Sequence, residues 1–180
     1  MRITKSKILL TVLVGLTLIA GVTSKAAKPD GPVNASWKGA ESMTLTSAGP
    51  NVARCGAFPE NIQLTFSGSG IDTEGGLFDV VASACTNTTT NLIFDLKATD
   101  TYVQGGDQVF IEADSFVQII NPANCLATNS HAVTARVAGG TGAHAGATGP
   151  ARFNFANNLT PCNRQNVPAH VWFEGVIMRL

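Results

Sequence analysis

The chain has 180 residues, of which 12 are lysine or arginine and 12 are aspartate or glutamate, and charged residues make up only 13 % of it. A balanced chain with so few charges offers no basic surface for a phosphate backbone, so we expect no nucleic-acid partner. The length predicts one domain of ordinary size.

Residues 1–26 have the pattern of a secretory signal peptide. A basic start precedes an apolar core at residues 8–20, which is shorter than the about 20 residues that a membrane helix needs. Small side chains predict cleavage after Ala26, cleavage after Ser24 fits nearly as well, and an uncleaved anchor is the weaker alternative. The rest of the chain keeps 8 basic and 12 acidic residues, a net charge of −4. We therefore expect a secreted or periplasmic protein that has no membrane contact once the signal is removed.

A linker is expected over residues 27–36, followed by a single domain over residues 37–180. Patterns of alternating or β-branched residues, bounded by glycine- and asparagine-rich turns, predict strands near 37–47, 62–67, 77–84, 92–98, 107–120, 131–138, 151–155 and 170–180. The strand over 107–120 is expected to be the longest, and no segment shows the pattern of an amphipathic helix. About eight short strands favour a barrel or a sandwich, and closure into a barrel removes exposed sheet edges.

Four cysteines follow the signal peptide: Cys55, Cys85, Cys125 and Cys162. An exported chain keeps disulfides, and four cysteines allow three connectivities. We favour Cys55–Cys85 and Cys125–Cys162, each closing a loop of about 30 to 40 residues. No C-x-x-C pair occurs, and no histidine stands at ligand spacing from a cysteine, so we expect neither a metal site nor a cofactor.

A glycine-rich corner, GGTGAHAGATG at residues 139–149, lies between two of the predicted strands. A dinucleotide-binding loop would need a helix directly after the glycines and an acidic residue about 20 positions further on. Here phenylalanines follow at alternate positions, Phe153 and Phe155, and no acidic residue occurs between Asp114 and Glu174. The segment is therefore interpreted as strand, corner, strand.

This corner resembles the GGTGxFxGATG signature of secreted bacterial proteins that are related in fold to the allene oxide cyclase and dirigent barrels. His144 stands where that family usually has an aromatic residue such as phenylalanine. The resemblance extends over roughly residues 62–155 and implies a small antiparallel barrel with an apolar interior, without a settled activity. We therefore expect an all-β, antiparallel, eight-stranded barrel stapled by disulfides, with a β-sandwich as the alternative.

Three functions fit that expectation. The first is a secreted, non-enzymatic barrel that binds a small apolar ligand. The second is an isomerase or cyclase that acts on a ligand held in the barrel, as the plant relatives do, which needs a rigid apolar cavity with a few placed polar groups. The third is a structural or adhesive extracellular protein with a filled interior. We favour a role without catalysis, because no nucleophile motif such as G-x-S-x-G occurs.

Charged residues on the predicted strands are expected to point to solvent, since such side chains are rarely buried unpaired. They are Asp95, Glu112, Asp114, Arg136, Arg152 and Glu174. Glu112 and Asp114, two apart on one strand face, are the candidates for acid–base chemistry. His144, Arg136 and Trp172 are the candidates for ligand contact, although Trp172 is expected first as a core residue.

Overall fold

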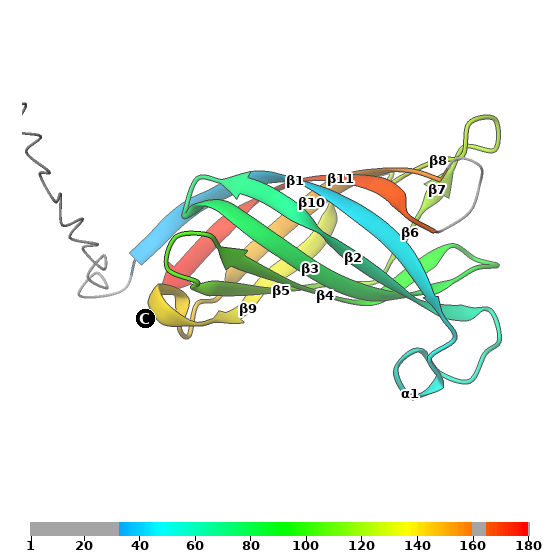
Figure 1. Ribbon diagram of the computed structural model, residues 1–180, viewed down its shortest axis with the longest axis horizontal. Coiled ribbons are helices and arrows are strands. Elements are labelled where there is room, and N and C mark those ends of the chain that lie inside the picture. Colours follow the sequence, from blue (N-terminus) through cyan, green and yellow to red (C-terminus); the bar gives the residue numbers. More distant parts are fainter. Residues whose placement is uncertain (1–32, 160–164, 180) are drawn as a thin grey trace, which may run out of the picture.

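The structure is a computed structural model that describes residues 33–159 and 165–179 (Figure 1). The elements in chain order are β1 (Val33–Gly49), α1 (Val52–Cys55), β2 (Asn61–Asp72), β3 (Gly76–Asn87), β4 (Leu92–Tyr102), β5 (Gln108–Ala113), β6 (Phe116–Val117), β7 (Ile119–Ile120), β8 (Leu126–Thr128), β9 (Val133–Gly140), the 3-10 turn η1 (Gly142–His144), β10 (Gly149–Asn158) and β11 (Val167–Arg179). The predicted signal peptide, residues 1–26, lies outside the described residues. β1 already begins at Val33, so the last four positions of the predicted linker are strand.

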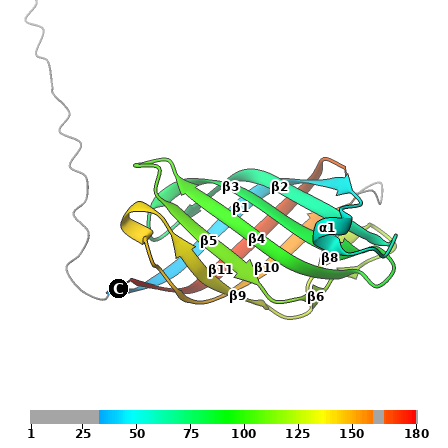
Figure 2. The ribbon, with the colours of Figure 1, turned by 90° about the horizontal axis from the view of Figure 1, so that it is seen from below.

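Eight strands close into an antiparallel barrel. They pair in the order β1, β2, β3, β4, β5, β9, β10 and β11, and β11 pairs back to β1. Figures 1 and 2 show these strands wound around a common axis. Closure satisfies the backbone hydrogen bonds of every strand without an exposed edge. The predicted all-β barrel is therefore confirmed, and the sandwich alternative is excluded.

The two ends of the barrel differ. α1 and the short strands β6, β7 and β8 lie at one end, which we call the helix end. The glycine corner with η1 lies at the other end, close to the C-terminal end of β11 (Figure 2). β9, η1 and β10 form the predicted sequence of strand, corner and strand, and the chain continues from the glycines as a strand. The nucleotide-loop interpretation is thereby excluded.

Every second side chain of the barrel strands points inward and joins one apolar core. The most deeply buried members include Trp37, Leu45, Leu64, Phe78, Val80, Val109, Val137 and Ile177. Two glycines provide room for aromatic rings in this interior. A Cβ atom on Gly70 would lie 2.3 Å from Cζ of Phe78, and one on Gly39 would lie 2.3 Å from Cζ of Phe173. The strands thus use glycine where a ring crosses the backbone closely.

Substitution of Gly39 by alanine is expected to destabilise the barrel by about 1 to 3 kcal/mol, because the added methyl group overpacks the core. Besides the ring of Phe173, the new Cβ would meet the backbone oxygen of Ile71 at 2.6 Å, which cannot rotate away. Urea unfolding followed by circular dichroism measures the change. Ser69→Ala, on the exposed face of β2, is the control. Equal midpoints for the two variants would contradict the packing assigned to Gly39.

The prediction of one long strand over residues 107–120 is wrong. β5 ends at Ala113, and after the exposed pair Asp114 and Ser115 the chain resumes as the two short strands β6 and β7. β6 pairs with the start of β4, the same strand that β5 pairs with further along. The pairing of β5 with β9 stops at Ala113, opposite Ala135, whereas the pairing with β4 resumes at Phe116. Phe116 then turns inward over the helix end and packs against Phe153 and Phe155, with ring centroids 5.8 and 5.5 Å apart.

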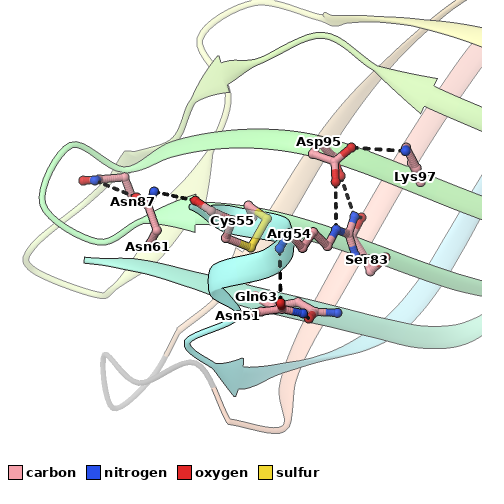
Figure 3. Close-up of a disulfide and its surroundings, with 10 residues drawn as sticks. Asn51, Arg54, Cys55, Asn61, Gln63, Ser83, Asn87, Asp95 and Lys97 are labelled. Carbon is pink, nitrogen blue, oxygen red and sulfur yellow. Dashed lines mark hydrogen bonds and ion pairs between the residues drawn. A yellow bond between two sulfur atoms is a disulfide. The ribbon is translucent and has the colours of Figure 1, made fainter. Parts of the chain in front are cut away.

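The segment expected to be loop around Cys55 contains the single helical turn α1. The side chain of Asn51 caps it by accepting a hydrogen bond from the backbone nitrogen of Arg54 at 3.2 Å. Arg54 ties this turn to β4, because its Nε donates to Asp95 Oδ2 at 2.8 Å (Figure 3). No helix among the described residues is long and apolar enough to cross a membrane.

Cys55 forms a disulfide with Cys85, which confirms one of the two predicted pairs. The bond joins α1 to the C-terminal end of β3, and the two Cα atoms lie 5.5 Å apart (Figure 3). Cys125 is also disulfide-bonded. Cys162 lies outside the described residues, so the Cys125–Cys162 pair stays a prediction. A disulfide is compatible with an extracellular or periplasmic location.

Candidate ligand site inside the barrel

The barrel interior holds a cavity of about 70 Å³. One water needs about 10–15 Å³, whereas a typical pocket for a drug-sized molecule has roughly 300–1,000 Å³. Aromatic rings form much of the wall: Trp37, Phe66, Phe116, Phe153, Phe155 and Phe173. Four polar residues also line it: Glu41, Gln118 and Asn157, which are buried, and Arg152, which is exposed and paired with Glu174. The space is smaller than the roughly 150 Å³ apolar cavity that binds benzene in another protein, so a single-ring ligand has to displace some of the side chains that line it.

Asp72, at the end of β2, is a buried carboxylate with a full set of donors. Its Oδ2 accepts hydrogen bonds from Trp37 Nε1 at 2.8 Å and from the Tyr102 hydroxyl at 2.6 Å. Its Oδ1 accepts from the backbone nitrogens of Glu74 at 2.9 Å and Gly75 at 2.8 Å. Four donors are what an ionised carboxylate can accept. Asp72 therefore places one negative charge at the end of the barrel opposite α1.

Asp100, on β4, has no such support. Its side chain is fully buried, and neither carboxyl oxygen has a hydrogen-bond partner. Burial raises the pKa of Asp100 well above its ordinary value, and the nearby charges of Glu41 and Asp72 raise it further. Desolvation and like charge both disfavour the ionised form. Both effects favour the protonated form of Asp100.

Glu41 is a third buried acid, interacting electrostatically with Asp72 and Asp100, and it lines the cavity. It stands on β1 between Val171 of β11 and Gly70 of β2, and only 8 % of it is exposed. Burial, and then the charge of Asp72, raise the pKa of Glu41 to about 7. It therefore exchanges a proton near neutral pH at the wall of an apolar cavity. An acid or base with a pKa near the working pH is well suited to proton transfer.

Among the described residues, no basic side chain neutralises these three acids. Every lysine and arginine among the described residues is paired with another acid: Lys38 and Arg152 with Glu174, Arg54 and Lys97 with Asp95, Arg136 with Glu112, and Arg179 with Glu74. Within residues 33–159 and 165–179, Glu41, Asp72 and Asp100 have no ion-pair partner. An acidic interior without a counter-charge is costly unless protons or a ligand compensate it.

His144 closes the barrel at the glycine corner and is buried, with 5 % exposed. Its ring centroid lies 5.1 Å from that of Tyr102, and its Nδ1 lies 3.3 Å from Nη2 of Arg179. Burial lowers the pKa of His144, which the carboxylates of Asp107 and Asp72 partly oppose. His144 does not line the cavity, so its predicted ligand contact would have to be made at this end of the barrel.

The other residues predicted from sequence lie on the outer surface. Glu112 and Arg136 form an ion pair across β5 and β9, Asp114 is exposed, and Trp172 is 53 % exposed. The expectation that Trp172 is a core residue is wrong, whereas Trp37 and Phe173 are core. None of the four lines the cavity. A catalytic or ligand-binding role for them stays a prediction.

Three buried acids were not predicted from the sequence as candidate site residues: Glu41, Asp72 and Asp100. Glu41 shares the inward register of Trp37, Met43 and Leu45, and this period-two pattern was the available signal. Asp72 adjoins a turn and reads locally as a turn residue. Only barrel closure brings the three acids together.

The fold defines a dirigent-like β-barrel. No protein-family model matches the chain, and the comparison with curated proteins found no match. Among solved structures, the chain is similar to "Structure of the pterocarpan synthase dirigent protein GePTS1", with a TM-score of 0.52 and 12 % sequence identity, over 83 % of this chain and 86 % of that one. At this identity the likeness shows the fold alone. The expected dirigent-like barrel is confirmed, whereas bacterial origin and secretion stay predictions.

Proposed function

We propose that this protein is a secreted barrel that binds a small, mainly apolar ligand in its interior without transforming it. The observation that carries the proposal is the aromatic cavity with the buried Glu41 in its wall. Ligand sites combine an apolar lining with a few placed polar groups. A barrel selected only for stability would gain by replacing buried, unpaired acids with apolar side chains. The N-terminal signal pattern and the disulfides support export.

A second candidate is an isomerase, cyclase or synthase. One specific observation favours it: Glu41, whose pKa is raised to about 7, faces the cavity and can take up or release a proton there. The dirigent protein of similar fold is a pterocarpan synthase by name. A structural or adhesive role, the third hypothesis, would need no cavity at all.

Toluene is expected to bind saturably in the cavity, with a dissociation constant on the order of 0.1 to 1 mM for so small a ligand. Methyl signals of the cavity-lining isoleucine and leucine side chains in a ¹³C NMR titration measure this binding. Ala135→Phe, which fills the cavity from β9, should abolish it. Thr134→Phe, on the exposed face of the same strand, is the matched control and should bind as the unchanged protein does. No saturable binding, or equal binding by both variants, would contradict the proposal.

A further inference from the structure

Glu41 is an unpaired carboxyl, more than nine-tenths buried, that lines an aromatic cavity. From this arrangement we propose that the ligand of the cavity is cationic: a small organic amine or ammonium ion whose apolar body fits among the aromatic rings and whose charged group meets Glu41. The inference rests on the proposed function, since it names the chemical class of the ligand bound at that site.

The charge balance of the interior is the first argument. Glu41 and Asp100 interact with each other and with Asp72, and all the interactions between them are repulsive. The six described lysines and arginines are committed to other acids, so nothing in residues 33–159 and 165–179 supplies the missing positive charge. A bound ammonium group would pair with the carboxylate of Glu41 in a desolvated place, where such hydrogen bonds are strong.

The aromatic wall is the second argument, and it is independent of the acids. Trp37 and Phe173, which line the same cavity as Glu41, have ring centroids 4.3 Å apart and stand on strands that flank one another. Phe116, Phe153 and Phe155 form a second group of rings toward the helix end. Faces of aromatic rings attract ammonium ions and form the cages that bind quaternary ammonium ligands. A cavity lined by a carboxylate and by many aromatic rings therefore favours a cation.

A neutral ligand satisfies the site less well. A carbonyl group can only accept a hydrogen bond from protonated Glu41. A hydroxyl group can also donate one to the ionised form, but it brings no positive charge to offset the charge of Asp72. An ammonium ion stabilises the ionised form. Binding should then release a proton from Glu41 at pH 6, where this carboxyl is still largely protonated. The titratable groups that act on Glu41 are Asp72 of β2 and Asp100 of β4, whereas its neighbours Gly70 and Val171 do not titrate.

Three probes of nearly equal shape test the inference: benzylamine, benzyl alcohol and toluene, titrated at pH 7 by calorimetry and NMR. Benzylamine, which is protonated at this pH, is expected to bind at least about tenfold more tightly than benzyl alcohol. Glu41→Gln should weaken benzylamine binding by about tenfold or more and change the affinity for benzyl alcohol by less than about threefold. Asp79→Asn, on the exposed face of β3 and outside the cavity lining, is the matched control and should change neither affinity.

Proton release is the second readout and needs no variant. Calorimetry of benzylamine binding at pH 6, in two buffers of different ionisation enthalpy, should show release of between about half and one proton. Tighter binding of benzyl alcohol or toluene than of benzylamine, or no proton release, would overturn the cationic ligand and leave the proposed function standing. Absence of saturable binding by all three probes would overturn the proposed function itself, and this inference with it.

Discussion

Replacing Glu41 with glutamine is expected to remove about 3 kcal/mol of pH-dependent destabilisation between pH 4 and pH 8. In the folded barrel, burial and the charge of Asp72 raise the pKa of Glu41 from 4.5 to about 7. A raised carboxyl pKa means that the folded state binds the proton more tightly than the unfolded state does. The contribution of Glu41 to stability is thus full below pH 4.5, falls as the pH rises through 7, and is lost above it.

The free energy of unfolding, measured by urea denaturation at pH 4 and pH 8 for the unchanged protein and for Glu41→Gln, tests this expectation. The quantity compared is the change between the two pH values, so any constant cost of burying an amide cancels. Asp79→Asn, which alters an exposed carboxylate on β3, controls for the loss of one charge. The same pH dependence in the unchanged protein and in Glu41→Gln would show that Glu41 is solvated. Asp100→Asn should act in the same direction, since burial raises the pKa of Asp100 as well.

Loss of the disulfide between Cys55 and Cys85 is expected to lower the free energy of unfolding by about 3 to 4 kcal/mol, because the bond closes a long loop in the unfolded chain. The two residues are 30 positions apart. Part of this loss of stability arises in the folded state, from contacts that the disulfide holds in place around α1. α1 has only four residues and holds Arg54 against Asp95 and Ser83, with hydrogen bonds of 2.8 and 2.5 Å.

The double variant Cys55→Ala and Cys85→Ala, unfolded in urea without reductant, measures this effect and leaves the disulfide of Cys125 intact. An Arg54→Met variant, with the disulfide in place, separates the polar contacts of α1 from the covalent bond. It should cost about 1 to 3 kcal/mol, because it removes the charge-assisted hydrogen bonds of a partly buried guanidinium to Asp95 and Ser83. A loss below about 1 kcal/mol in the double cysteine variant would contradict the stabilising role given to this disulfide.

Much of the fold follows from sequence because strand patterns are local. The alternation of Ile62, Leu64 and Phe66 predicts a strand with one apolar face, and β2 contains these positions. The glycine corner likewise predicts a turn between strands. Where a strand is interrupted is not a local property. Asp114 and Ser115 separate β5 from β6 at the point where the pairing of β5 with β9 stops, and the pairing with β4 resumes after them.

The candidate site was largely hidden from sequence for the same reason. The sequence predicts Glu112 and Asp114 as site candidates because they are neighbouring carboxylates. The register of β5 against β9, however, places Glu112 opposite Arg136 on the outer surface. Glu41 and Asp100 are 59 positions apart on strands that are not hydrogen-bonded to each other. They meet only across the closed barrel. Long-range closure, rather than any motif, creates the acidic interior.

The ¹³C signal of the Glu41 side-chain carboxyl, assigned by its absence from Glu41→Gln and followed through a pH titration, tests most directly whether an unpaired acid faces the cavity. We predict a midpoint of about 7 in the free protein. Saturating benzylamine should lower that midpoint, since the ammonium group stabilises the carboxylate. A midpoint near the ordinary value of 4.5, unchanged by benzylamine, would contradict this account.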